Sequence, residues 1–248
     1  MAKKPAKTER QAVIDQIRKE QKGGERRRGM MIVGVCVLIA VLILAFPIYS
    51  VVKDKLDLRQ YDKTDLAEIG AAASVCQEVE TKPANGTQDH VPPGTPLNYP
   101  EAPPAFGQHY DMPDAMARKF YTAKDRPELG TLVHNLEHGY TILWYDETIA
   151  DDAEQMKVIR GIASKFEGTS NFRFKFKAVP WTSEDSDSAE FPEGQHIAYT
   201  HWSAGGSGNT DPTKQVGVWQ YCSEPSGEAL DGFMREYPYT DSPEPGAM

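Results

Sequence analysis

The chain has 248 residues and a formal net charge of −9, and this charge is unevenly distributed. Residues 1–29 carry ten Lys or Arg and four Asp or Glu, a net of +6, and residues 30–52 carry no charge. Residues 53–248 therefore carry −15. An acidic portion of this size repels polyanions, so we expect no nucleic-acid partner.

The uncharged run over residues 30–52 predicts one transmembrane helix, and it directly follows Arg26, Arg27 and Arg28. As a helix it spans about 35 Å, enough for a hydrocarbon core of about 30 Å. A cleaved signal peptide has an apolar core of about 7–15 residues and a small-residue cleavage site. The run is longer and has no Ala-x-Ala pattern at its end. We therefore expect an uncleaved anchor in the lipid bilayer.

The basic residues before this run predict the orientation of the chain. Lys and Arg that lie within about 15–20 residues of a span stay on the cytoplasmic side. We therefore expect a single-pass plasma-membrane protein with a cytoplasmic arm of residues 1–29 and with residues 53–248 outside.

The cysteines favour a disulfide in the outer part. Cys36 lies inside the predicted span, whereas Cys76 and Cys222 lie outside, where disulfides persist. No CxxC or Cys-x-His spacing indicates a cysteine metal site. We expect a Cys76–Cys222 disulfide with Cα atoms about 5.5–6 Å apart.

The first half of the outer part shows three kinds of segment. Residues 53–75 predict a membrane-proximal stalk. Residues 83–113 contain eight prolines, which exclude a helix or a central strand, and also aromatic residues, so this segment is expected to pack across the domain. Residues 140–145 (YTILWY) form a short apolar run that is typical of a strand.

The second half alternates helical and strand patterns. Residues 149–166 carry an amphipathic helical stripe, and Phe172, Phe174 and Phe176 alternate with basic residues as in a half-buried strand. Residues 196–202 and 216–221 predict two more strands. Ser223 or Ser226 is expected to cap a last helix that Pro238 stops, and residues 239–248 to form a disordered tail.

These elements predict an extracytoplasmic α+β domain over residues 76–238, with a mainly antiparallel sheet and two or three helices. One N-terminal transmembrane helix precedes it. The strands and helices do not alternate as regular βαβ units, which disfavours a parallel sheet.

The densest group of histidines lies in His134-Asn135-Leu136-Glu137-His138-Gly139. On a helix, His134 and His138 share one face, as two ligands of a metal ion do, and they also converge in a tight turn. Glu137 precedes the second histidine, so the segment differs from the His-Glu-x-x-His protease motif. In the alternative interpretation, these histidines only bond the backbone.

A third metal ligand has to come from elsewhere in the chain. His109 is the best candidate because it follows a proline-rich segment, and His90 is the next. Met112 suits a soft metal such as copper. Three imidazoles with Glu137 as ligand or orienting group predict a copper or zinc site.

Other catalytic motifs are missing from the sequence. No Gly-x-Ser-x-Gly elbow is present, and residues 205–208 lack the lysine of a P-loop. His201 and Trp202 are expected to pack on a strand. We assign no catalytic residue, and a hydrolase ranks third among the functions considered.

Two segments resemble an uncharacterised bacterial family common in actinobacteria, the domain of unknown function 3105. One runs from Tyr99-Pro100 through Pro103-Pro104 and Gly107 to His109, and the other is Leu132–Gly139. The similarity covers roughly residues 70–240 and extends to the plan of basic arm, membrane helix and outer domain. It implies no reaction, but it points to the same histidines. The family often has Ala-Trp where this chain has His201-Trp202.

Two function classes follow from these patterns. The first is a protein that binds copper or zinc through His109, His134, His138 and Glu137. The second is a non-catalytic accessory subunit of a membrane or cell-envelope complex. Converging imidazole nitrogens favour the first class, and dispersed histidines with an exposed apolar patch favour the second.

The predicted orientation is tested by adding protease to intact spheroplasts. We expect residues 53–248 to be degraded and the arm of residues 1–29 to be protected, because the basic residues hold the arm inside. Immunoblots with antibodies against each part measure this. Protection of the large acidic part would contradict the orientation.

Overall fold

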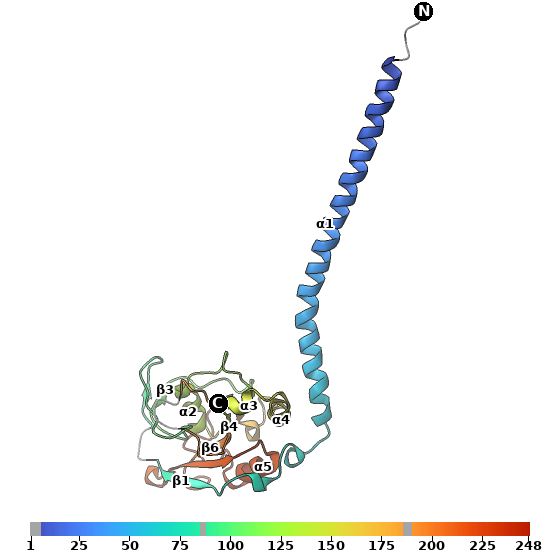
Figure 1. Ribbon diagram of the computed structural model, residues 1–248. Helices are drawn as coiled ribbons and strands as arrows, with labels where there is room; N and C mark the ends of the chain where they lie inside the picture. Colours follow the sequence, from blue (N-terminus) through green and yellow to red (C-terminus); the bar gives the residue numbers. More distant parts are fainter. Residues whose placement is uncertain (1–5, 85–87, 186–189) are drawn as a thin grey trace, which may run out of the picture. The chain divides into compact units, whose positions relative to one another are not determined.

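A computed structural model describes residues 6–84, 88–185 and 190–248 (Figure 1). The chain divides into two compact units, Met1–Leu56 and Asp57–Met248. The first unit consists of most of one long helix, and the second contains a sheet with helices on both of its faces.

The helix α1 runs from Ala6 to Leu58 without interruption. Within it, Arg26–Phe46 is long and apolar enough to cross a membrane, and the side chains of this stretch are exposed. The predicted span of residues 30–52 therefore lies in one helix that also includes much of the basic arm. A helix of this kind near an N-terminus is a candidate membrane span or signal sequence.

The second unit has a five-stranded sheet of order β1-β7-β6-β4-β5. Every neighbouring pair is antiparallel except β4 and β5, which are parallel and are joined through α3 and α4. The strands are β1 (Glu80–Pro83), β4 (Thr141–Tyr145), β5 (Phe176–Pro180), β6 (Ile197–Ser203) and β7 (Val216–Cys222). A separate parallel pair consists of β2 (His90–Val91) and β3 (His109–Tyr110). The predicted α+β class and mainly antiparallel sheet are confirmed.

The described helices of this unit are short. The α-helices are α2 (Leu129–Glu137), α3 (Glu147–Ala150), α4 (Ala153–Ser164) and α5 (Gly227–Glu236). The 3-10 helices are η1 (Arg59–Tyr61), η2 (Leu66–Glu68), η3 (Ala73–Val75), η4 (Phe172–Phe174) and η5 (Pro212–Lys214). The single helix expected over residues 149–166 is divided, because the Asp152 side chain accepts the first N–H groups of α4 and starts a new helix. Ser226 caps α5.

The sheet separates two hydrophobic cores. Alternate residues of β4 point to opposite faces, so Leu143 and Tyr145 join the core under α4 and α5, whereas Ile142 and Trp144 join the core under α2. The second core also contains the buried Trp202 and Trp219 and the alanines of the proline-rich segment. That segment packs across the domain, as its aromatic residues indicated.

The strand expected at Phe172, Phe174 and Phe176 is corrected by the structure. Phe172–Phe174 forms a 3-10 turn because the Asn171 side chain accepts the backbone N–H of Arg173, and β5 begins at Phe176. Lys177 does not face solvent. It is fully buried and bonds the Asp114 carboxylate and the carbonyl oxygen of Ala115.

The structure differs from the stalk expected over residues 53–75, because residues 53–58 are the end of α1 and residues of the segment 59–75 pack in the core of the second unit. Ile69 is buried in the core beside α5, and its carbonyl oxygen accepts the N–H of Gly227. Leu66 packs against the same core. The apolar side chains of this segment are more stable in the core than in water, so the compact unit begins at Asp57 rather than at Cys76.

The C-terminal segment of residues 239–248 is packed rather than disordered. Asp241 and Ser242 are buried, and the Asp241 carboxylate accepts hydrogen bonds from the Ser203 hydroxyl and the Gly206 backbone. Consistent with these bonds, the C-terminus lies against the body of its unit in Figure 1. Polar side chains hold this tail in place. Its sequence therefore has no apolar periodicity from which the packing could have been predicted.

Cys76 and Cys222 form a disulfide that closes 146 residues. Their Cα atoms lie 3.9 Å apart, closer than the expected 5.5–6 Å. The two residues are opposite each other in an antiparallel bridge, where the backbones approach more closely than at most disulfides.

Replacing Cys222 by alanine should destabilise the protein by roughly 2–5 kcal/mol, because a loop of this length restricts the unfolded chain strongly. Denaturant unfolding of the full chain in detergent, followed by tryptophan fluorescence, measures the change. Cys36→Ala is the matched control, since Cys36 is an exposed free thiol in α1, and it should leave the midpoint unchanged. Equal midpoints for the two variants would show that the disulfide does not stabilise the domain.

Candidate metal centre

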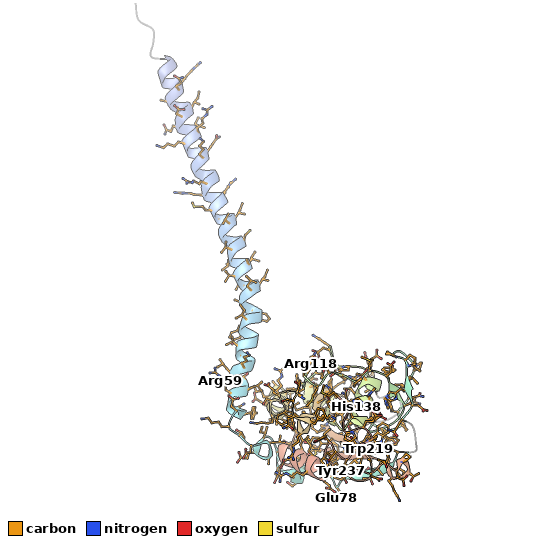
Figure 2. All side chains as sticks on the ribbon, turned by 180° about the vertical axis from the view of Figure 1, so that it is seen from behind. Arg59, Glu78, Arg118, His138, Trp219 and Tyr237 are labelled. Atoms are coloured by element: carbon orange, nitrogen blue, oxygen red, sulfur yellow. A yellow bond between two sulfur atoms is a disulfide. The ribbon has the colours of Figure 1, made fainter. Side chains whose placement is uncertain are left out.

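The helix α2 and its C-cap residue His138 place three side chains of the predicted site on one face. His134, Glu137 and His138 stand at positions i, i+3 and i+4, which are neighbours on a helix surface. All three are nearly or fully buried. His138 lies inside the folded unit in Figure 2. The helix ends at Glu137 with His138 as its C-cap, and Gly139 follows with a φ of +87° that other residues rarely adopt.

The parallel pair of β2 and β3 delivers the other two histidines. His90 and His109 are register partners, so their side chains lie next to each other, and their ring centroids are 4.4 Å apart. The chain turns into β3 at Gly107, whose φ is +133°. The ring of Tyr99 lies close to Gly107, so a side chain at this position would require that ring to shift by a few tenths of an ångström.

His90, His109 and Glu137 place their ligand atoms in a small triangle. The His109 Nε2 atom lies 3.0 Å from Glu137 Oε2 and 3.2 Å from His90 Nε2, and His90 Nε2 lies 3.5 Å from Glu137 Oε2. Ligands about 2.0–2.1 Å from a tetrahedral ion are about 3.3 Å from each other. A ring nitrogen of His134 supplies a fourth ligand atom within 4.8 Å of the others. The triangle thus already has the size of one face of a coordination tetrahedron.

The hydrogen bonds of His109 fix which of its nitrogens is free. Its Nδ1 atom lies 2.8 Å from the carbonyl oxygen of Gly107, which only accepts, so Nδ1 carries a proton. In the neutral ring, Nε2 then presents a lone pair to the Glu137 carboxylate. Two acceptors 3.0 Å apart repel each other unless a cation lies between them, either a proton on His109 or a metal ion.

His134 is arranged in the same way. Its Nδ1 atom donates to the carbonyl oxygen of Tyr110 at 2.5 Å, so its Nε2 lone pair points inward. Metal-binding histidines commonly donate their second N–H to a backbone carbonyl, which orients the ring. The His134 Nε2 atom lies 2.9 Å from His138 Nε2, and His138 Nε2 lies 3.6 Å from Glu244 Oε2.

A chain of amide side chains holds the Glu137 carboxylate in place. Gln88 donates to Glu137 Oε1 at 2.8 Å, and Gln215 donates to Gln88 at 3.0 Å. The indole N–H of Trp202 donates in turn to Gln215 at 3.1 Å. Glu137 Oε2 faces the histidines, and Oε1 keeps a second lone pair beside the one that accepts the bond from Gln88.

The electrostatic environment keeps the cluster in its ligand form. Burial lowers the pKa of His134, and burial with the neighbouring His134 lowers the pKa of His138 to about 4. Burial by itself raises the pKa of Glu137, but hydrogen bonds with His109 and Gln88 outweigh it and lower that pKa below its ordinary value. At neutral pH, His134 and His138 are neutral and Glu137 is a carboxylate, the forms that bind metals.

The structure brings together His109, His134, His138 and Glu137, the residues predicted to form the site. It adds His90, which the sequence ranked second, and it leaves out Met112, which is 64% exposed. His201 bonds two backbone carbonyl oxygens, as expected of a packed residue. Gln88 and Glu244 were missed, since no local pattern marks a side chain that reaches the site from a distant loop.

A family model described as a protein of unknown function (DUF3105) matches residues 90–248, more than half of the chain. Comparisons with curated proteins and with solved structures gave no match. The matched region begins at His90 and includes all the histidines and glutamates of the cluster. Any function therefore has to be argued from the geometry.

The lowered pKa of His138 predicts that the metal-free protein loses stability in mild acid. An unfolded histidine takes up a proton near pH 6.5, whereas folded His138 takes one up only near pH 4. The unfolded state therefore gains protons first as the pH falls from about 6.5 to about 4. This earlier proton uptake by the unfolded state lowers the free energy of unfolding at pH 5.5 by about 1 kcal/mol relative to pH 7.5.

Urea unfolding of the full chain in the presence of a chelator, measured at pH 7.5 and 5.5, tests this effect. A His138→Asn variant keeps a polar side chain that does not titrate. The difference in the free energy of unfolding between pH 7.5 and pH 5.5 should therefore be smaller in this variant than in the parent. The same difference in both proteins would assign the acid sensitivity to other groups, among them His134.

Proposed function

This chain belongs to the DUF3105 family of proteins of unknown function, and we propose that it binds a divalent transition-metal ion. The ligands are His90, His109, His134 and Glu137. The observation that carries the proposal is the triangle of His90, His109 and Glu137 atoms with edges of 3.0–3.5 Å. The backbone bonds of His109 and His134 support it, because they leave both Nε2 lone pairs directed inward.

The donor set favours zinc or copper(II). Three imidazoles and one carboxylate suit both ions, and the described cluster contains no sulfur ligand that would favour copper(I). Copper(II) generally binds such sites more tightly than zinc, so affinity alone does not decide which ion is bound in the cell. Four protein ligands fill a tetrahedral zinc site, as in sites that bind a metal without catalysis.

A location outside the cytoplasm is part of the same proposal. The apolar helix around Arg26–Phe46 supplies a candidate anchor, and the Cys76–Cys222 disulfide suits an oxidising compartment. The alternative function, an accessory subunit that docks on an envelope complex, needs an apolar docking surface. In the described part of residues 57–248, the large exposed apolar side chains are Met112 and Met248, which gives that alternative little support.

Replacing His134 and His138 together by alanine should abolish zinc and copper(II) binding, because this removes one ligand and its neighbouring imidazole. Isothermal titration of the chelator-treated full chain in detergent measures the affinity, and elemental analysis measures the bound metal. The single variant His109→Ala should lower the metal affinity at least tenfold.

The matched control is His196→Ala. His196 is only partly buried and bonds Asp146 at 2.7 Å, away from the cluster, so this variant should bind metal like the parent. Circular dichroism of each metal-free variant checks the fold. Unchanged binding in the double variant would refute the metal site. Unfolding of the double variant under metal-free conditions that leave the parent folded would assign the histidines a structural role.

A further inference from the structure

We propose that a second divalent cation binds next to the first, on Glu137, His138 and Glu244, with the Glu137 carboxylate shared between the two ions. This inference rests on the proposed function, since the first ion occupies the neighbouring site. The residues of the second group each offer one ligand atom, and these atoms lie within 4.8 Å of one another. Carboxylate oxygens and imidazole nitrogens suit the same divalent ions as the first site.

His138 is not among the proposed ligands of the first ion. The triangle of His90, His109 and Glu137 with His134 already supplies four ligands. His138 is 5% exposed, and its Nδ1 atom has no hydrogen-bond partner among the described residues. Its Nε2 atom lies 2.9 Å from His134 Nε2 and 3.6 Å from Glu244 Oε2. A buried imidazole next to two carboxylates has the position of a ligand for a separate ion.

The C-terminal segment is fastened so that Glu244 stays beside His138. The backbone N–H of Glu244 donates to the carbonyl oxygen of Glu137 at 3.0 Å. The buried Lys175 ammonium binds the carbonyl oxygens of His138 at 2.6 Å, Pro245 at 2.9 Å and Ala247 at 2.7 Å. One cation thus ties the end of α2 to the residues that follow Glu244.

The charges around the second site also fit a cation. Glu137 and Glu244 contribute two carboxyl groups, and both lie close to the His138 imidazole. The neighbouring ammonium of Lys175 points at backbone carbonyls rather than at the ligands.

The two sites differ in how open they are. The first site has four ligands, three of which are almost fully buried. The second has three ligands, and the Glu244 side chain is 48% exposed, so water can complete the coordination. Zinc sites with three protein ligands and one water are the reactive kind, because the ion lowers the pKa of the bound water to about 7. The second ion therefore supplies an exchangeable position that the first does not.

The stoichiometry of zinc binding to the full chain in detergent tests this inference. We expect the chelator-treated protein to bind two zinc ions per chain, one tightly and one more weakly. Glu244→Gln should retain the first ion with an affinity within about threefold of the parent, and weaken the second at least tenfold. Glutamine keeps the size of the side chain and the backbone bond to Glu137. Glu236→Gln is the matched control at an exposed glutamate in α5 and should bind two ions.

Copper(II) provides a second measurement that needs no variant. Two copper ions that share a carboxylate lie about 3.5–4 Å apart, so their electron spins couple and the paramagnetic signal of the loaded parent falls below that of two isolated ions. Glu244→Gln should restore the signal of one isolated ion.

The possible outcomes separate the two proposals. One zinc ion per chain and an uncoupled copper signal in the parent would overturn the second site and leave the first intact. Binding of no ion would overturn both. Two ions that survive in Glu244→Gln with unchanged affinities would place the second ion elsewhere.

Discussion

The Glu137 carboxylate is a charge in the interior of the protein, and the arrangement around it follows from the need to compensate that charge. A buried, unpaired carboxylate is costly, and it becomes tolerable only with hydrogen bonds and cationic partners. Gln88 supplies a hydrogen bond to one oxygen, and His90 and His109 approach the other. The residues that stabilise Glu137 are therefore the residues that converge into a metal site.

Three separate parts of the chain meet around Glu137. The helix α2 carries Glu137 itself, the proline-rich segment brings β2 and β3 across it, and the C-terminal segment closes over the end of the helix. The sheet contributes indirectly, because Trp202 on β6 orients Gln215 and through it the carboxylate. The site thus depends on tertiary packing of segments that have little regular structure of their own.

Two buried lysines, Lys175 and Lys177, also hold loops in place. Lys177 lies in β5, and Lys175 directly precedes this strand. Each lysine donates hydrogen bonds from its ammonium group to several oxygen atoms. These bonds fasten the C-terminal segment and the loop around Asp114. The bonds tie these segments to the sheet and hold in position the ligands that they carry or support.

The sequence by itself determined the features that depend on neighbouring residues. The apolar run before residue 52, the strand of residues 140–145 and the shared helical face of His134 and His138 all follow from local periodicity. Only the tertiary structure decided that His90 pairs with His109, and that Glu244 lies beside His138. The physical reason is that single hydrogen bonds and charge pairs between distant segments leave no periodic pattern, whereas each apolar face repeats along its element.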